Sequence, residues 1–160
     1  MKKEYPLRAD NLAKTLTAAY FVICIFVTFL IYSISFFIGT LLACFLAVVT
    51  VLTYLLTPLK VIPEEKGVRI KRVAGSVFIP YREIKNVTTA KFPAFRLLGS
   101  GGLFGFYGIF YSKNIGKVKV YSRSRKGLVI LETEKDKIGL GINKEDFKDF
   151  ISTVKERVKG

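Results

Sequence analysis

The sequence predicts an α-helical transmembrane hairpin followed by a mainly-β domain of about seven strands, capped by a C-terminal amphipathic helix. Three observations predict this fold. The 45 residues from Thr15 to Leu59 contain no charged side chain. From Gly67 onward, apolar and polar side chains alternate with a period of two, which is typical of β-strands. From residue 143 the apolar side chains recur with the period of a helix.

The uncharged segment is long enough for two membrane spans. As a single helix it would extend about 67 Å at ~1.5 Å per residue, roughly twice the ~30 Å hydrocarbon core of a bilayer. A cleaved signal peptide is excluded because its apolar core is only roughly 7–15 residues long. We expect one helix at Leu16–Phe36 and another at Leu41–Thr57, ended by Pro58. The turn is expected among the polar or flexible residues between them, which are Ser33, Ser35, Gly39 and Thr40.

The distribution of basic residues predicts the orientation of this hairpin at residues 15–59. Residues 1–14 form a basic N-terminal segment with four lysines and arginines, the inter-helix turn has none, and five more lie between Lys60 and Arg72. Because cytoplasmic flanks carry an excess of Lys and Arg, both termini are expected in the cytoplasm. The sequence therefore predicts a multi-pass protein of the cell membrane.

Most of the net charge of +14 belongs to the part of the chain after the hairpin, since 22 of the 26 basic residues lie in residues 60–160. A basic domain beside a cytoplasmic leaflet is attracted to anionic lipids by about 1 kcal/mol per close Lys or Arg. Nucleic acid is the other common polyanion for such a charge. The tether brings lipid head groups closer, so we expect membrane lipids as partners and no nucleic acid.

After a short charged linker at residues 60–66, the chain is expected to form consecutive short strands with a corner at residues 81–84. The expected strands are residues 68–73, 76–80, 86–92, 104–111, 117–123, 127–132 and 137–142. Asn143 is expected to cap a final helix that docks on the sheet. The apolar face of this helix comprises Phe147, Phe150, Ile151, Val154 and Val158. These elements fit a small barrel closed at one end by the helix.

Three segments of this domain resemble the bacterial pleckstrin-homology-like (PH-like) domains. They are the hairpin GVRIKRVAGSVFIPYREI with an Ile-Pro-Tyr-x-x-Ile corner at 79–84, the stretch LGSGGLFGFYGIFY at 98–111, and the closing INKEDFKDFISTV at 142–154. PH-like domains of this kind often follow two transmembrane helices. The resemblance implies a PH-like split barrel for residues 67–160. Its motifs are core and turn residues and contain no catalytic signature.

Several kinds of catalytic site are excluded by residues that the chain lacks. It has no histidine, which removes Ser-His-Asp and Cys-His nucleophiles and most zinc sites. Cys24 and Cys44 lie in the expected spans at different depths, where they are interpreted as small packing residues. Carboxylates clustered within residues 132–149 are explained by solvated faces and helix N-terminal charge. We therefore expect no enzyme activity, no cofactor, no metal and no small-molecule substrate.

The glycine-rich stretch at 99–105 superficially resembles a nucleotide-binding loop. Such a loop needs a helix after it, whereas an aromatic strand is expected here, so the glycines indicate strand curvature. Next to Lys91 and Arg96, an apolar loop is expected from Leu97, Leu98, Leu103, Phe104 and Phe106. Three environments remain open for this loop, namely the bilayer interface, a neighbouring subunit and the domain core.

Basic side chains alternate with apolar ones along the expected strands and should share an outer face. The candidate residues for binding an anionic surface are Arg69, Lys71, Arg72, Lys117, Lys119, Arg123, Arg125 and Lys126. In eukaryotic PH domains, basic residues around the first hairpin hold inositol phosphates, and the resemblance implies a similar position for the first three. The alternative is a charged face that is merely solvated.

The sequence as a whole predicts a membrane-tethered cytoplasmic PH-like binding module. It would act as an adaptor or regulator that engages a protein partner, the anionic membrane surface, or both, because a tether raises the effective concentration of weak partners. The alternative function is a homo-oligomeric membrane scaffold, self-associated through the PH-like domain. An ion pathway is disfavoured because the spans carry no ionisable charge.

Overall fold

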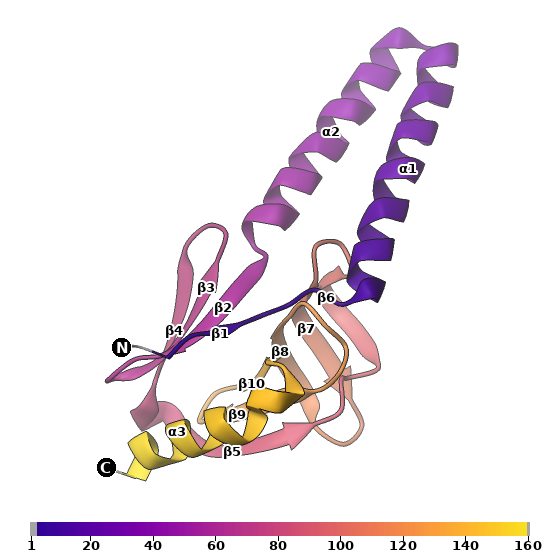
Figure 1. Cartoon of the computed structure of the whole chain (residues 1–160). Coiled ribbons are helices and arrows are strands. Elements are labelled where there is room, and N and C mark those ends of the chain that lie inside the picture. Colours follow the sequence, from indigo (N-terminus) through magenta and orange to yellow (C-terminus); the bar gives the residue numbers. More distant parts are fainter. Residues whose placement is uncertain (1–2, 160) are drawn as a thin grey trace.

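The computed structural model describes residues 3–159 and shows two long helices that project as a hairpin from a mainly-β domain (Figure 1). Helix α1 spans Asn11–Ile34 and α2 spans Phe36–Leu55. By length and composition, both are apolar enough to cross a membrane. The expected order of helical hairpin, mainly-β domain and terminal helix is confirmed.

The turn of the hairpin is shorter than the sequence suggests. Ser35 alone separates the helices. Gly39 and Thr40, which were expected in the turn, lie inside α2. The Thr40 hydroxyl donates to Phe36 O at 2.9 Å, a bond within its own helix. Gly39 is buried, and a Cβ there would lie 2.9 Å from the Tyr32 ring, so this glycine allows α2 to approach α1 closely.

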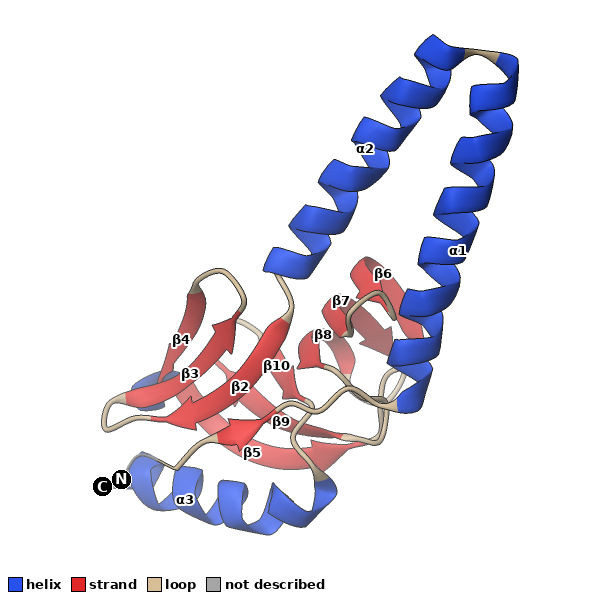
Figure 2. Ribbon diagram, turned by 45° about the horizontal axis from the view of Figure 1, so that its top comes forward, coloured by secondary structure: helices blue, strands red, loops and turns tan. Residues whose placement is uncertain are grey.

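The domain consists of two sheets (Figure 2). The first has the order β1-β2-β3-β4, with strands at Tyr5–Pro6, Pro58–Pro63, Gly67–Arg72 and Ser76–Pro80. A 3₁₀ turn at Tyr81–Glu83 leads into the second sheet. The second sheet contains Ile84–Ala90 (β5), Phe95–Gly101 (β6), Phe106–Ser112 (β7), Gly116–Ser122 (β8), Leu128–Thr133 (β9) and Lys137–Leu140 (β10). Its order is β5-β9-β10-β8-β7-β6, with β10 parallel to β8.

All the expected strands are present, and three further strands bring the number within residues 3–159 to ten. β1 is too short to show a period and is a strand because Tyr5 pairs with Val61 of β2. β2 occupies residues 58–63, although the sequence predicts a linker at 60–66. The sequence does not indicate this strand because consecutive residues are buried there, so that apolar and polar side chains do not alternate. β6 contains the adjacent apolar residues Leu97 and Leu98, followed by glycines. Its sequence therefore shows no alternation of apolar and polar side chains, and this strand is also not predicted.

The hairpin is inserted within the domain, because β1 precedes α1 and β2 follows α2 in the same sheet. Tyr5 and Leu7 are buried in one apolar core of the domain, and Ala13 at the start of α1 is buried in another. The N–H of Leu7 donates to Leu59 O at 2.8 Å. The sequence places residues 1–14 outside the domain, whereas the described part of this segment is built into it.

The two cores lie on opposite faces of the second sheet. Along β9, Val129 and Leu131 contribute to the first core, while Leu128 and Ile130 contribute to the second. The first core also includes the inner faces of the first sheet and α3. The second core is enclosed by β7 and β8 and by the start of α1. This alternation explains why β9 is buried on both faces although it belongs to a small domain.

Helix α3 (Phe147–Lys159) docks its apolar face on the first core, as the sequence predicts. Phe150 and Val154 are fully buried. The partly buried side chains of this face that pack against the same core are Phe147, Ile151 and Val158. Asn143 makes no side-chain capping bond, so that expectation is wrong; a 3₁₀ turn at Lys144–Asp146 separates it from the helix.

Tyr5 joins the N-terminal strand to α3. Its ring meets the Phe150 ring edge to face, with the centroids 5.1 Å apart. Its hydroxyl donates to Asp149 at 2.5 Å, and Lys3 forms an ion pair with the same carboxylate. Burial, together with the hydrogen bond to Asp149, raises the pKa of Tyr5 to about 12. The Lys3 ammonium and the Tyr5 hydroxyl both lower the pKa of Asp149.

Replacement of Phe150 by Ala tests how much the docking of α3 contributes to stability. Because the side chain is fully buried, we expect the free energy of unfolding to fall by about 3–5 kcal/mol, out of the roughly 5–15 kcal/mol of a typical domain. Chemical denaturation of the detergent-solubilised chain measures this change. The matched variant Lys155→Ala, on the exposed face of α3, should shift stability by less than about 0.5 kcal/mol. An equal, small effect of both variants would show that α3 is not docked.

The raised pKa of Tyr5 predicts a loss of stability at alkaline pH. At a pH below the ordinary pKa of 10.0, the phenol is neutral in both the folded and the unfolded chain. The contribution of Tyr5 to the free energy of unfolding is therefore fully present there. As the pH rises from 10 toward 12, only the unfolded chain loses the proton, and the free energy of unfolding should fall by about 2 kcal/mol. Denaturation curves of the wild-type chain and Tyr5→Phe should therefore converge over this range. Curves that stay parallel would contradict the prediction.

Candidate anionic-surface site

The turn between β6 and β7 lies between the two long helices, at the ends of α1 and α2 that are nearest to the domain. The Phe104 ring packs edge to face against Phe21 of α1, at 6.3 Å between centroids, and against Tyr54 of α2, at 5.3 Å. The Phe104 N–H donates to Thr17 Oγ1 at 3.0 Å. This turn therefore connects both helices to the second sheet. It defines the place here called the foot of the hairpin.

The glycines of this turn allow it to approach α1 closely. Phe104 is the one non-glycine residue in the described chain with a positive φ, at +57°, a region that disfavours L side chains. Gly102, with a φ of +147°, lies so close to Leu16 that a Cβ would collide with it. A strand, rather than a helix, follows the turn. The stretch at 99–105 thus lacks the helix N-terminus that a phosphate-binding loop requires.

The apolar residues expected together in one loop are separated by the structure. Phe106 is 2% exposed and belongs to the second core, which is one of the three environments left open for it, and it lies in the strand expected at residues 104–111. It points inward because residues of β7 alternate between two faces. Phe104 lies between the helices, whereas Leu97 and Leu98 are 59% and 68% exposed on the edge strand β6.

Asp10 joins the start of α1 to the loop between β8 and β9. Its Oδ1 accepts from Ala13 N at 2.9 Å and caps the helix. Its Oδ2 accepts from Arg125 N at 2.9 Å, and its own N–H donates to Arg123 O at 3.1 Å. This loop carries Arg123, Arg125 and Lys126, so three candidate basic residues lie next to the first turn of α1.

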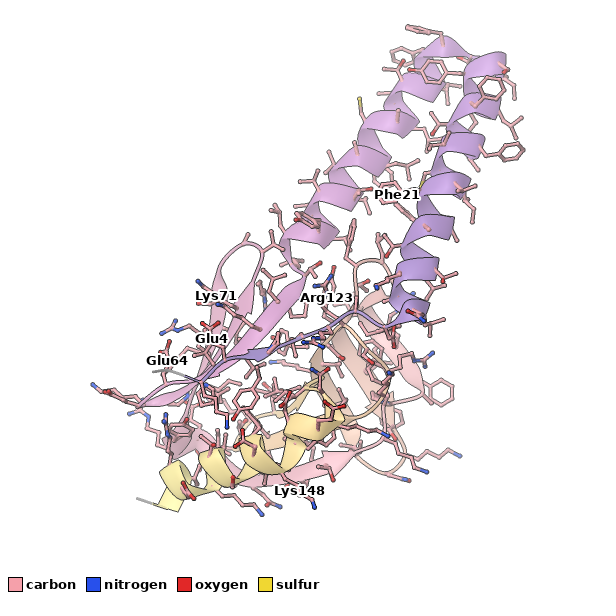
Figure 3. All side chains as sticks on the ribbon, viewed as in Figure 1. Glu4, Phe21, Glu64, Lys71, Arg123 and Lys148 are labelled. Carbon is pink, nitrogen blue, oxygen red and sulfur yellow. The ribbon has the colours of Figure 1, made fainter. Side chains whose placement is uncertain are left out.

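The candidate residues on β3 have three different environments. Arg69 donates to both carboxylate oxygens of Glu64, at 2.8 and 2.9 Å, which raises the pKa of Arg69. Lys71 is exposed (Figure 3). Arg72 stacks on the Tyr121 ring of β8 at 5.2 Å and donates to its hydroxyl at 3.2 Å. The Arg72 Nε is buried and has no hydrogen-bond partner among the described residues.

The candidate residues on β8 and the following loop are equally varied. Lys117 is exposed. Lys119 donates to Asp136 at 2.6 Å, which raises the pKa of Lys119. Arg123 is half-buried, and its Nε has no hydrogen-bond partner within the described chain. Figure 3 shows Arg123 beneath the space between the two helices.

Arg125 and Lys126 complete the predicted set. The Arg125 guanidinium lies over the rings of Phe92 and Phe106, 5.3 and 5.6 Å from their centroids. Lys126 is exposed beside α3. The eight candidate residues thus come from both sheets and the loop after β8, and two of them, Arg69 and Lys119, are already paired with carboxylates.

Two cavities flank the β6–β7 turn at the foot of the hairpin. One of 340 Å³ lies beside α1, and Lys14 and Arg123 are among its lining residues. The other, of 490 Å³, lies between both helices and β6, and Arg96 lines it. Arg72 is close to the same region, because the two residues after it hydrogen-bond to the end of α2. We call Lys14, Arg72, Arg96 and Arg123 the basal cations.

The basal cations form no ion pair with any residue in the described range 3–159. They contain two of the predicted site residues, Arg72 and Arg123, and two that the sequence analysis did not include. The available signal for Lys14 was its position directly before the uncharged run. The signal for Arg96 was its place next to exposed leucines. Neither signal could show that these cations gather around the same helix ends.

The side chains of the described residues do not suggest a metal centre. Across the described chain, no group of three or more His, Cys, Asp or Glu side chains could hold a metal ion. Cys24 and Cys44 are free thiols on α1 and α2. The chemistry available at the foot of the hairpin is therefore the attraction of guanidinium and ammonium groups for anions.

A protein-family model described as "Bacterial PH domain" matches residues 59–158. The match begins within β2 and ends within α3, so it includes both sheets except for β1. No curated protein and no solved structure matches the chain.

Proposed function

The chain belongs to the bacterial PH domain family, and on this basis we propose that it is a membrane-tethered binding module of the cell membrane. The two apolar helices would provide the tether, with the termini in the cytoplasm. The module would act by binding rather than by catalysis. Its physiological role would be that of an adaptor or regulator, which holds a protein partner near the anionic membrane surface.

The insertion of the hairpin into the domain supports this orientation. β1 and β2 flank the hairpin in the chain and pair directly with each other. If the hairpin crosses the bilayer twice, the residues before α1 and after α2 must therefore lie on one side. The basic residues on both flanks favour the cytoplasmic side.

The basal cations support an interaction with anionic lipids. They surround the ends of helices that are proposed to leave the bilayer at this level, and Lys14 and Arg123 share one cavity. A cation without a carboxylate partner near a negatively charged leaflet gains about 1 kcal/mol. This arrangement is the observation that carries the proposed function. It favours general attraction to anionic head groups, since Lys14 and Arg123 line one cavity and Arg96 lines another.

A homo-oligomeric scaffold is the alternative function, and the β6 edge favours it. β6 lies at the edge of the second sheet, and its Phe95, Leu97 and Leu98 side chains are mostly exposed. Exposed edge strands can pair with another chain. The mass of the detergent-solubilised particle distinguishes a monomeric module from such a scaffold.

Reporter fusions test the proposed topology. A reporter placed after Gly160 should be active in the cytoplasm, and so should one placed before Tyr5. A reporter inserted at Ser35, the turn residue, should be active outside. These results follow if both helices span the membrane and the basic flanks stay inside. An external C-terminal reporter would refute the orientation.

Thermal unfolding in nanodiscs tests the role of the basal cations. We expect the full chain to unfold at a higher temperature in discs that contain phosphatidylglycerol than in pure phosphatidylcholine. Arg72→Gln, Arg96→Gln and Arg123→Gln together should remove most of this difference and leave only the contribution of Lys14. Each cation is expected to contribute about 1 kcal/mol, equivalent to about 4–8 °C in a small domain. The difference should also shrink at high salt, since the Debye length is only ~8 Å at physiological ionic strength.

A variant with the same loss of charge provides the control. Lys66, Lys113 and Lys135 are exposed and lie in turns at the strand ends remote from the hairpin. Their replacement by Gln should leave the stabilisation by phosphatidylglycerol intact. If both triple variants lose it equally, net charge rather than the basal cations is responsible. If the wild-type chain unfolds at the same temperature in both lipids, the lipid interaction is refuted.

A further inference from the structure

A groove of 610 Å³ runs beside the first turns of α3. Its other walls are the end of β5 and the loop between β8 and β9. Small and apolar residues line its floor, namely Ala90, Gly127, Phe147 and Ile151. Gly127 has a φ of +138°, a backbone conformation that favours glycine, and a Cβ there would lie at an ordinary contact distance of 3.7 Å from the Phe147 ring, so this loop adjoins the helix. The floor therefore has an apolar surface that solvent reaches.

Four lysines surround this floor, and each comes from a different segment. They are Lys91 after β5, Lys126 between β8 and β9, Lys144 in the 3₁₀ turn, and Lys148 in α3. All four are exposed, and within residues 3–159 none of them forms an ion pair. We call this feature the lysine groove. Lys126 is the one member that the sequence analysis selected.

The nearby carboxylates leave the lysine groove positively charged. Asp149 of α3 binds Lys3 and Tyr5 of the N-terminal segment. Glu145 and Asp146 adjoin Lys144 in the chain, but neither forms an ion pair with the four lysines. Like charges gathered around one groove repel each other, and an anionic ligand relieves this repulsion.

The lysine groove begins at the β8–β9 loop, which also carries Arg123, and extends away from the hairpin to Lys144 and Lys148 on the α3 side. In both views of the molecule, α3 and the hairpin lie at opposite ends of the domain (Figures 1 and 2). Lys148 points away from the hairpin in Figure 3. A bilayer crossed by α1 and α2 would therefore face the basal cations rather than the α3 side of this groove. Lys144 and Lys148, on the α3 side, therefore need a different anionic ligand.

We propose that the lysine groove binds an extended acidic segment of a protein partner, with one apolar side chain of that segment packed on Phe147 and Ile151. The lysine rim complements carboxylates, and the apolar floor complements an aliphatic side chain. Nucleic acid fits less well, because single strands bind to basic grooves that also present aromatic rings for base stacking, and the one ring of this floor is half-buried. The inference rests on the proposed tether in one respect, since the tether directs the groove into the cytoplasm.

Fluorescence anisotropy with a synthetic peptide tests this site. The full chain is placed in nanodiscs of pure phosphatidylcholine, so that no anionic lipid competes. The probe is a labelled peptide of about twelve residues, long enough to cross the groove at ~3.3 Å per residue, with Glu and Asp around one central Leu. We expect saturable binding of this peptide and none of its Gln/Asn counterpart. Replacement of the central Leu by Gly should weaken binding about ten-fold.

Two variants with equal net charge locate the binding. Replacement of Lys91, Lys126, Lys144 and Lys148 by Gln should weaken binding at least about ten-fold. The same replacement of the exposed Lys66, Lys113, Lys135 and Lys155 should change it by less than about two-fold. Equal losses in both variants, or no binding of the acidic peptide, would overturn the proposal. So would tighter binding of single-stranded DNA through the same four lysines. Because the discs are neutral, failure here would leave the proposed lipid interaction standing.

Discussion

The structure depends on one constraint, which is that the hairpin begins and ends inside the folded domain. Asp10 caps α1 while it accepts a hydrogen bond from the β8–β9 loop, and the end of α2 hydrogen-bonds to the turn between β3 and β4. Between these two connections, Phe104 packs against both helices. The helices are therefore held by both sheets, and a tilt of the hairpin would have to break these contacts.

This connection decides which surface the domain presents to the proposed membrane. A domain attached through one flexible linker could rotate, and any of its basic faces could meet the lipid. Here β1 and β2 pair on either side of the hairpin, so the rotation is prevented and the cations at the foot would face a bilayer crossed by the two helices. The glycine-rich stretch at 99–105 contributes by allowing its turn to approach α1. Its composition is thus explained by the contact between hairpin and domain.

The many cations fall into two groups that differ in their capacity to bind an external anion, according to whether a carboxylate partner lies beside them. Arg69 and Lys119 have their charge balanced by neighbours, and exposed pairs of this kind add little to stability. The basal cations and the lysine groove lack such partners among the described residues. They adjoin at the β8–β9 loop, which carries both Arg123 and Lys126, and from there the basal cations surround the helix ends while the lysine groove extends to α3. A module with two positive regions could hold a membrane on one side and an acidic segment on the other. This division agrees with an adaptor role and gives it a geometric basis.

The sequence by itself determined the hairpin, the mainly-β domain and the docked face of α3, because each produces a local signal. A run without charge, a period of two, and the spacing of Phe150 and Val154 are visible in short windows. Only the tertiary structure decided β1, β2 and the grouping of the cations. Tyr5 is a strand residue because Val61, far along the chain, pairs with it. Likewise, whether a lysine is neutralised depends on the carboxylate that folding brings beside it. Periodicity cannot contain that information, since it describes neighbours in the chain and not neighbours in space.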